Sequence, residues 1–277
     1  RNPASHAGNS GSIPLCATFF KIFYHMVDSS IEKHKTSAQI SVVINTYNAE
    51  KYLEKVLDSV KQFDEIVICD MFSTDRTLEI AKKYNCRIVF HKKEPFVEPA
   101  RNFAIQSASY EWVLLVDADE VISDELRQYL YEFVQNAKED VMGLKIPRRN
   151  FFMGRFMHGT YPDHILRFFR KNKIVWPSEI HLQPKVEGII KIPAKHKEWA
   201  ILHLADESIE ELITKMNIYT TGEIPKRRDK GIKFVSLFTK PSFNFFKIYI
   251  LKGGFRDGKP GFIHACFKGM YKFIMVS

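Results

Sequence analysis

Two aspartates directly after an apolar segment are the residues with the clearest chemical potential. Residues 112–116 read Trp-Val-Leu-Leu-Val and are followed by Asp117, Ala118 and Asp119. Alternate residues of an extended chain point the same way, so both carboxylates could face one ligand. Two oxygen ligands with open coordination positions suit Mg²⁺ or Mn²⁺ bridging phosphates. The alternative is that one carboxylate caps the following helix while the other is solvated.

The segments that would position these carboxylates alternate between strand and helix. Short β-branched or apolar runs predict strands, and apolar residues at helical spacing predict helices. The predicted strands are 40–44, 64–69, 87–90, 112–116 and 200–204, and the predicted helices are 50–62, 77–84, 98–108 and 123–136. We expect Thr74 or Asp75 to cap the second helix and Ser123 to cap the fourth.

This element order predicts an α/β fold with a Rossmann-like, mainly parallel sheet and helices on both faces. Ligands of such sheets bind outside the carboxyl ends of the strands. The polar loops at Asn45, Asp70 and Asp117 each follow a strand, so we expect them to meet at one edge. The sequence has neither a Gly-x-Gly-x-x-Gly nor a P-loop pattern, so it does not support those nucleotide sites.

The positive charge is concentrated at the C-terminal end. The 277 residues have a net charge of +9, and residues 226–277 alone carry 12 Lys and Arg against two acids, or +10. Nine of the 23 Phe lie in the same segment. Basic residues interleaved with aromatic ones favour a helical segment at an anionic membrane surface. A helical subdomain with solvated lysines and a nucleic-acid surface are the alternatives, and the surplus of Phe argues against nucleic acid.

No segment reads as a transmembrane helix, which would need about 18 or more apolar residues without charge. Residues 13–35 could form an amphipathic helix, and residues 1–12, rich in Gly, Ser and Asn, are set aside as a lead. The four Cys form no Cys-x-x-Cys pair, so they predict neither a disulfide framework nor a zinc site. This usage fits a reducing compartment.

Four segments, in this order, resemble glycosyltransferase family 2, inverting enzymes of the GT-A fold. They read Val-Val-Ile-Asn-Thr-Tyr-Asn (42–48), Asp-Met-Phe-Ser-Thr-Asp-Arg-Thr (70–77), Ala-Arg-Asn-Phe-Ala (100–104) and Trp-Val-Leu-Leu-Val-Asp-Ala-Asp-Glu (112–120). The downstream part is similar to the branch of lipopolysaccharide core β-1,4-glucosyltransferases. Its matching pieces include Pro-Arg-Arg-Asn (147–150) and Gly-Gly-Phe-Arg-Asp-Gly-Lys-Pro-Gly (253–261).

The resemblance implies roles for individual residues. It assigns the nucleotide-sugar pocket to Thr46, Tyr47, Asn48, Asp70, Arg101, Asp117 and Ala118. Tyr47 would lie against the base, Asp70 would accept a hydrogen bond from the base imide, and Arg101 would stand near the ribose or diphosphate. Asp119, with Asp117 beside it, would bind the Mg²⁺ or Mn²⁺ that neutralises the departing nucleoside diphosphate. On the residues alone, Tyr47 could be simple packing, Asp70 a turn residue and Arg101 a partner of Glu98.

An inverting transfer also needs a general base for the acceptor hydroxyl. Members of the family often carry Glu after a His in this region, whereas Leu182 follows His181 here. Glu179 is the first candidate for the base and Asp163 the second. His203, in a predicted strand, is either a core histidine or a third metal ligand, and imidazole suits Mn²⁺ better than Mg²⁺. Candidates for acceptor binding are Arg148, Arg149, Arg167 and His181.

These observations predict an inverting, metal-dependent transfer of a hexose from a nucleoside-diphosphate sugar, with UDP as the expected nucleotide. The acceptor would be a glycan or glycolipid of cell-envelope or lipopolysaccharide biosynthesis, and the enzyme would be cytoplasmic and peripheral at the inner face of the membrane. A nucleotidyltransferase-like enzyme and a catalytically silent nucleotide-sugar-binding module are the alternatives. The expected division is a lead (1–37), a nucleotide-sugar half (38–140), an acceptor half (141–222) and a basic aromatic segment (223–277).

Overall fold

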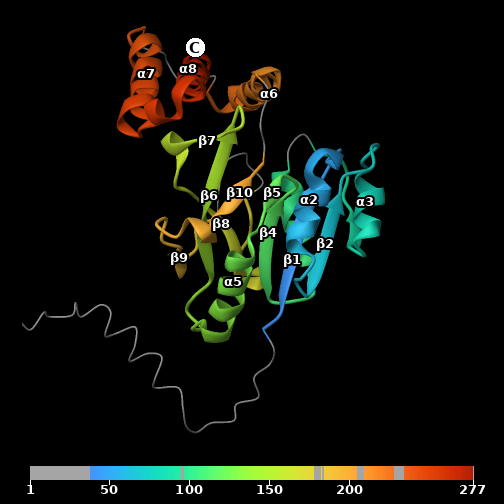
Figure 1. Cartoon of the computed structure of the whole chain (residues 1–277). Helices are drawn as coiled ribbons and strands as arrows, with labels where there is room; N and C mark the ends of the chain where they lie inside the picture. The colour runs from blue at the N-terminus through green and yellow to red at the C-terminus, as the bar shows by residue number, and fades with distance from the viewer. Residues whose placement is uncertain are drawn as a thin grey trace, which may run out of the picture. The chain divides into compact units, whose positions relative to one another are not determined.

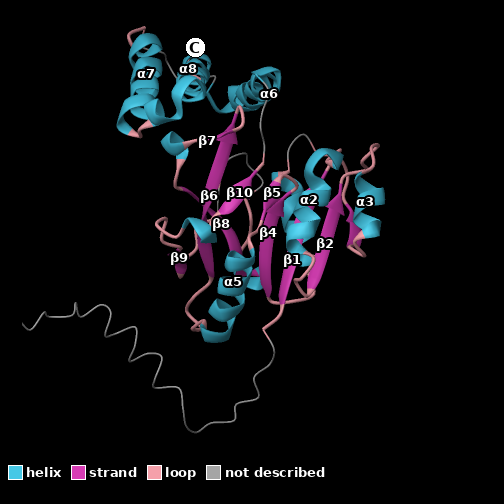
Figure 2. Ribbon diagram, viewed as in Figure 1, coloured by secondary structure: helices cyan, strands magenta, loops and turns pink. Residues whose placement is uncertain are grey.

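The structure, a computed structural model, describes residues 38–94, 97–177, 182, 184–204, 209–227 and 234–276. Strands and helices alternate through the first half of this part, as Figures 1 and 2 show. The elements there are β1 (Ile40–Thr46), α2 (Glu50–Val60), β2 (Glu65–Asp70), α3 (Thr77–Lys83), β3 (Arg87–Phe90), α4 (Glu98–Gln106), β4 (Trp112–Asp117), β5 (Glu120–Val121) and α5 (Asp124–Asn136). The predicted helix at 13–35 lies outside the described residues.

The second half adds strands that extend the same sheet. They are β6 (Gly143–Phe152), β7 (Arg155–Phe156), β8 (Asp163–Arg170), β9 (Ile189–Lys191) and β10 (Ile201–His203). The strand order is β3-β2-β1-β4-β8-β6-β10-β5, with β7 and β9 paired to β6. β1 to β4 are all parallel, whereas β8 is antiparallel to both β4 and β6. The predicted parallel sheet is therefore confirmed for the first four strands, and the whole sheet is mixed.

Helices cover both faces of the sheet, as predicted. One face packs against apolar residues of α2, α3 and α5, including Leu57, Ile80 and Leu126. The other packs against Ala104 and Ile105 of α4. The central strands are buried on both faces, which explains why β1 and β4 are continuous apolar runs rather than alternating ones.

The register brings the polar ends of three strands together. Asn45 of β1 pairs with Asp117 of β4, and Thr46 pairs with Asp70 of β2. All three strands run parallel, so their carboxyl ends lie at one edge of the sheet. The prediction that the loops after these strands meet is confirmed.

The helix caps differ in part from the prediction. Ser123 caps α5 by accepting a hydrogen bond from the Leu126 amide. α3 begins after Arg76 instead, without a side-chain cap at that residue. Asp75 still contributes, because its carboxylate accepts hydrogen bonds from the amides of Thr77 and Glu50 and so ties the starts of α3 and α2 together.

A bulge interrupts the pairing of β8 with β6. Leu144 pairs with Phe168, but the next residue, Lys145, pairs with Leu166, so Arg167 is the extra residue. An extra residue in a strand reverses which face of the sheet the following side chains point to. Phe168 accordingly packs in the core on one face of the sheet, and Leu166 packs in the core on the other.

The C-terminal part is helical, as predicted. It contains α6 (Ile209–Arg227), α7 (Ser236–Phe246), a π-helical turn (Lys247–Leu251), a 3-10 turn (Gly254–Asp257) and α8 (Gly258–Ile274). The predicted boundary after residue 222 falls inside α6. In the described residues no helix combines the length and the low charge needed to cross a bilayer.

The C-terminal helices are fixed to the sheet domain by a buried acid and by close-packed glycines. Asp257 is 2% exposed, and its carboxylate accepts hydrogen bonds from the amides of His158 and Gly159. A Cβ on Gly159 would lie 3.0 Å from the Cα of Gly254, and one on Gly261 would overlap the carbonyl oxygen of Gly254. The glycines of 253–261 therefore allow backbone-to-backbone contact.

Candidate active site

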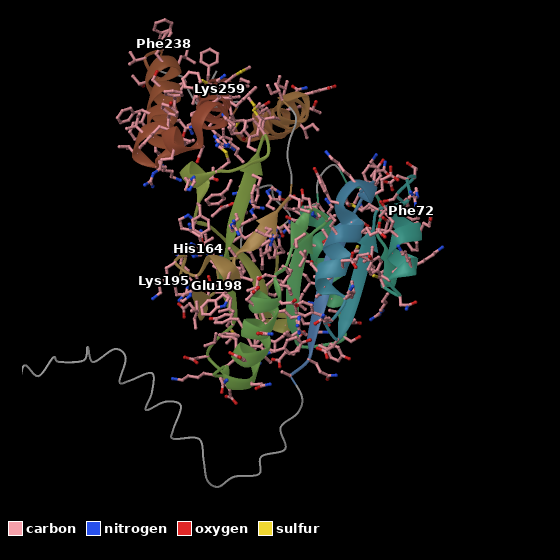
Figure 3. All side chains as sticks on the ribbon, viewed as in Figure 1. Phe72, His164, Lys195, Glu198, Phe238 and Lys259 are labelled. Carbon is pink, nitrogen blue, oxygen red and sulfur yellow. The ribbon has the colours of Figure 1, made fainter. Side chains whose placement is uncertain are left out.

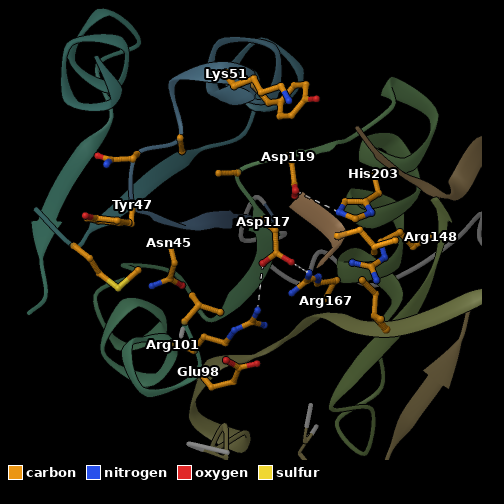
Figure 4. Close-up of a pocket in the computed structure, with 18 of the residues that line it drawn as sticks. Asn45, Tyr47, Lys51, Glu98, Arg101, Asp117, Asp119, Arg148, Arg167 and His203 are labelled. Carbon is orange, nitrogen blue, oxygen red and sulfur yellow. Dashed lines mark hydrogen bonds and ion pairs between the residues drawn. The ribbon is translucent and has the colours of Figure 1, made fainter. Parts of the chain in front are cut away.

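A cavity of about 980 Å³ opens at the carboxyl ends of β1 and β4. Figure 4 shows its polar residues converging from several elements. Its charged lining, among the described residues, consists of Lys51, Glu98, Arg101, Asp117, Asp119, Arg148, Arg167 and Lys268. Five of these side chains are basic and three are acidic, so the cavity favours an anionic ligand.

Asp117 is held between two guanidinium groups. Its Oδ1 lies 3.3 Å from Arg101 Nη2, and its Oδ2 accepts a short hydrogen bond from Arg167. Burial alone would raise the pKa of Asp117, but the charges of Arg167 and Arg101 outweigh it and hold that pKa well below its usual range. Asp117 is therefore a carboxylate whose two oxygens already have cationic partners.

Glu120 completes this network from inside the protein. It is fully buried, and its Oε1 accepts from Arg167 Nη2 at 2.9 Å and from Arg148 Nη1 at 3.1 Å. Its Oε2 accepts from the amide of Asp117 at 3.0 Å. Burial would lower the pKa of Arg167, but the charges of Asp117 and Glu120 raise it above its ordinary value. Glu120 was not among the predicted site residues, although a buried acid at a strand end requires a cationic partner.

Asp119 faces a different partner from Asp117. Residues 118 and 119 form a turn between β4 and β5, so the expected extended conformation of this segment is wrong, while a shared ligand for both carboxylates stays a prediction. Asp119 Oδ2 lies 3.3 Å from Nε2 of His203 (Figure 4). The backbone brings them together, because His203 pairs with Glu120 and the amide of Leu204 donates to the Asp119 carbonyl.

This Asp119–His203 pair fits a divalent cation. Adjacent ligands of an octahedral ion, with bonds of about 2.1 Å, are about 3 Å apart, close to the observed separation. Among the described residues no three His, Cys, Asp or Glu side chains form a complete metal site. Asp119 and His203 would be the ligands from this part of the chain, and phosphate oxygens and water could complete the coordination.

The residues predicted to contact the nucleoside are divided between cavity and interior. Tyr47, Asn48, Arg101 and Ala118 line the cavity. Thr46 and Asp70 are 1% and 0% exposed and do not line the cavity. Thr46 Oγ1 donates to the Asp70 carboxylate at 2.8 Å, and that carboxylate also accepts from the Ser73 amide and hydroxyl. In this structure Asp70 is a turn residue that shapes the loop after β2.

Lys93 is an unpredicted neighbour of Tyr47. Its ammonium donates to the Tyr47 hydroxyl at 2.6 Å and lies 4.1 Å from the centre of the ring. Arg101 has a comparable contact, because its guanidinium lies 5.0 Å from the ring centre of Trp176. Both contacts place a cation against an aromatic ring that lines the cavity.

The two arginines of β6 point to opposite faces. Arg148 lines the cavity, and its Nη2 donates to Asp163 at 2.7 Å. Arg149 does not line it: its guanidinium lies 5.4 Å from the ring centre of Phe156. Neighbouring residues of a strand alternate in direction, so of the two only Arg148 faces this cavity, and acceptor binding by Arg149 stays a prediction.

Of the two candidates for the general base, only Asp163 lies within the described residues. Asp163 does not line the cavity; burial would raise its pKa, but the charge of Arg148 lowers it, so this carboxylate is a weak proton acceptor. Glu179 and His181 lie outside the described residues. Arg167, a predicted acceptor-binding residue, lines the cavity, and its guanidinium forms ion pairs with Asp117 and Glu120.

The C-terminal helices contribute one wall of the cavity. Leu212 and Met216 of α6, together with His264, Lys268 and Tyr271 of α8, line it. The sequence predicted a membrane-surface role for this C-terminal segment, but gave no sign that it also lines the cavity. The burial of His264, with the nearby charge of Lys268, lowers the pKa of its imidazole to about 4.

Comparisons with known proteins agree with this geometry. A sequence model of the family described as "Glycosyl transferase family 2" matches residues 41–187. The chain is 28% identical over 250 residues to the lipopolysaccharide core biosynthesis glycosyltransferase LpsC of Rhizobium meliloti (strain 1021), covering 85% of this chain and 89% of that protein. Over 172 residues it is 27% identical to the poly(ribitol-phosphate) β-N-acetylglucosaminyltransferase TarS of Staphylococcus aureus, covering 51% of this chain and 30% of TarS.

A solved structure has the same fold. The mannosyltransferase PcManGT of Pyrobaculum calidifontis, solved in complex with GDP-Man and Mn²⁺, superimposes with a TM-score of 0.54 at 14% identity. The match covers 94% of this chain and 92% of that one. The predicted GT-A architecture is thereby confirmed.

Proposed function

Because the chain belongs to glycosyl transferase family 2, and is therefore a glycosyltransferase, we propose that it transfers a hexose with inversion from a nucleoside-diphosphate sugar to a glycan or glycolipid hydroxyl. The observation that carries the proposal is the Asp119–His203 pair beside a predominantly basic cavity at the carboxyl ends of β1 and β4. A diphosphate is the anion that such a combination of cations and metal ligands suits.

Asp119 and His203 are proposed to hold the divalent cation. When bound, the cation neutralises the charge that develops on the departing diphosphate. Asp117 is the weaker candidate for a ligand, because Arg101 and Arg167 already occupy its oxygens. We assign Asp117 and Ala118 to the wall of the donor pocket, with UDP as the proposed nucleotide.

The chain's own residues bind and orient the donor. Tyr47 and Asn48 would contact the nucleoside, and Arg101 and Arg148 would face the diphosphate from opposite sides of Asp117. Thr46 and Asp70 would act on the base through the loop that they shape. Arg167 keeps Asp117 ionised, so its role in acceptor binding is indirect.

Glu179 remains the proposed general base. Its rival Asp163 is bound to Arg148 and lies outside the cavity lining, which argues against proton abstraction there. The base takes the proton of the acceptor hydroxyl as its oxygen attacks the anomeric carbon, and the nucleoside diphosphate leaves from the opposite face. His181, two residues after Glu179, is proposed to contact the acceptor.

The proposed acceptor is an envelope glycolipid such as the core of lipopolysaccharide, reached from an anionic membrane surface. Its support is the relation to LpsC and the exposure of large apolar side chains on α7 and its flanks: Phe234 (72%), Val235, Phe238 (60%), Phe243 (62%), Leu251 and Phe255. Exposed lysines lie in the same C-terminal region, such as Lys240 on α7, Lys247 in the π-helical turn and Lys259 on α8. Figure 3 labels Phe238 on α7 and Lys259 on α8.

Apolar side chains with neighbouring lysines suit the interface of an anionic bilayer. We therefore place the enzyme at the inner face of the membrane as a peripheral protein. Nucleic acid is not proposed as a partner.

A donor hydrolysis screen tests the proposal. The full chain is incubated with UDP-, GDP-, ADP- and CMP-sugars, with and without Mn²⁺ or Mg²⁺, and the products are separated. We expect metal-dependent release of a nucleoside diphosphate from UDP-sugars, and an anomer inverted relative to the donor in transfer reactions. Release of pyrophosphate would favour a nucleotidyltransferase, and binding without turnover across the panel would favour a silent binding module.

A further inference from the structure

Asn150 lies between a metal-ligand candidate, His203, and the half-buried ion pair of Arg148 and Asp163. Its Nδ2 donates to Asp163 Oδ2 at 3.2 Å, and its Oδ1 lies 2.9 Å from Nδ1 of His203. The three side chains come from β6, β8 and β10, and Asn150 pairs directly with His203 in the parallel register. Asp163 is itself fixed by Arg148 Nη2 at 2.7 Å.

These contacts determine which nitrogen of His203 carries the proton. An ionised carboxylate only accepts hydrogen bonds, so the Asn150 amide must turn its NH₂ group toward Asp163. Its carbonyl oxygen then faces His203, and because a carbonyl also only accepts, Nδ1 of His203 must be the N–H donor. The neutral ring consequently presents the lone pair of Nε2 toward Asp119.

Two acceptors facing each other at 3.3 Å repel unless a proton on the ring or a metal cation lies between them. The neutral Nδ1–H imidazole and the Asp119 carboxylate are such a pair. A divalent cation satisfies both, which is why metal-bound histidines so often donate their other N–H to a second residue.

We propose that Asn150, oriented by Asp163, is a positioning residue that holds His203 as the Nδ1–H tautomer and so makes Nε2 a ligand of the cation shared with Asp119. The proposal rests on the metal dependence in the proposed function. It also gives Asp163 a role other than that of the general base: Asp163 selects the amide orientation of Asn150, and Arg148 holds Asp163 in place.

The tautomer can be tested in the unaltered, metal-free protein. The full chain is labelled with ¹⁵N-histidine, and the His203 signals are identified by their loss in His203→Gln. At a pH where the ring is neutral, we expect Nδ1 to carry the proton. A ring protonated at Nε2 would overturn the proposal, whatever the variants do.

Metal binding gives the second readout. Mn²⁺ affinity is measured by the loss of the free-ion electron paramagnetic resonance signal for the parent chain, Asn150→Leu and Asp163→Asn. We expect about 10- to 100-fold weaker Mn²⁺ binding for Asn150→Leu, as for the loss of other outer-shell partners, and a smaller loss for Asp163→Asn. Arg149→Leu, a change at the adjacent residue on the opposite face of β6, is the control and should bind Mn²⁺ like the parent chain.

The controls separate this proposal from the one on which it rests. If Asp119→Asn and His203→Ala weaken Mn²⁺ binding but a folded Asn150→Leu does not, the positioning role is wrong and the metal site stands. If none of these variants changes Mn²⁺ binding, the cation does not bind at this pair, and the metal dependence proposed for the site fails with it.

Discussion

The carboxylate of Asp257 lies 2.7 Å from Nδ1 of His158, although 99 residues separate them in the chain. This contact joins the start of α8 to the 3-10 turn His158–Thr160, which precedes β8. It explains how helices at the end of the chain come to form a wall of the cavity. We therefore expect the active site to depend on a residue far from its reacting groups.

Replacing Asp257 by Asn should loosen the C-terminal helices. The variant loses the charge that accepts hydrogen bonds from the His158 and Gly159 amides, at an expected cost of about 2 kcal/mol or more in the free energy of unfolding. Hydrogen exchange should accelerate across residues 236–274, and kcat/KM should fall. Asp124→Asn, at an exposed ion pair, is the control; equal exchange in both variants would contradict the anchoring role.

The same substitution at Arg148 and at Arg149 should cost very different amounts of stability. Arg148→Leu leaves the buried Glu120 with one guanidinium fewer and removes the partner of Asp163, so we expect a loss of roughly 3 kcal/mol in urea unfolding. Arg149→Leu removes ring contacts worth about 1 kcal/mol or less. A larger loss for Arg149→Leu would show that the charge network is not what stabilises this part of the sheet.

Removal of the divalent cation should abolish transfer. We expect chelation to stop donor turnover and Mn²⁺ to restore it. Asp119→Asn should lower kcat/KM by at least about 10²-fold, more than is usual for outer-shell changes. Steady-state kinetics across a Mn²⁺ titration measures both effects. Turnover that persists after the chelator has removed the cation would contradict the metal-dependent mechanism.

The half-buried His264 should make stability depend on pH. Its pKa is about 4 in the folded chain against about 6.5 when unfolded, so the unfolded state binds more protons between these values. The contribution is fully present above pH of about 6.5 and is lost as the pH falls toward 4, by roughly 3 kcal/mol at most.

Proton NMR titration of His264 checks that pKa directly, with Lys268 and Asp257 as its charged neighbours. In His264→Phe the stability loss over this range should be smaller than in the parent chain. Titration of the ring near its ordinary pKa would contradict the prediction.

Membrane binding should depend on the exposed phenylalanines of α7 and its flank. We expect the triple change of Phe234, Phe238 and Phe243 to Ser to reduce partitioning onto phosphatidylglycerol vesicles by about tenfold or more. High salt should weaken binding further. Vesicle flotation of the full chain measures this.

The matched control replaces two other exposed phenylalanines, Phe72 and Phe90, which stack on each other beside β2 and β3. Their change to Ser should leave flotation unchanged. Equal binding of the triple variant and the parent chain would exclude the C-terminal helices as the membrane contact.

The first half of the fold was predictable because its signals are local. β1 and β4 are apolar runs, α5 begins at a capping serine, and parallel pairing brings Asn45 beside Asp117 without any knowledge of distant residues. The acids of the site could be predicted for the same reason, since they directly follow a strand.

The rest of the site depends on pairings between distant segments. Asn150 reaches His203 only because β6 pairs with β10, and Arg148 separates from Arg149 only because β6 is extended at that point. No local pattern in the sequence indicates that α8 lines the same cavity as the end of β4. Glu120 is an exception, because it directly follows the predicted residues Asp117 and Asp119. A local signal for it was therefore present: a buried carboxylate needs a cationic partner.

The bulge at Arg167 has a consequence for chain length. In residues 163–166 of β8 the even-numbered side chains point to one face of the sheet, and in residues 168–170 they point to the other. The single extra residue, Arg167, causes this reversal. A deletion there would restore uniform alternation, turn Leu166 out of its core and move Asp163 across the sheet from Arg148. We therefore expect variants of this protein to tolerate substitutions in β8 far better than insertions or deletions of one residue.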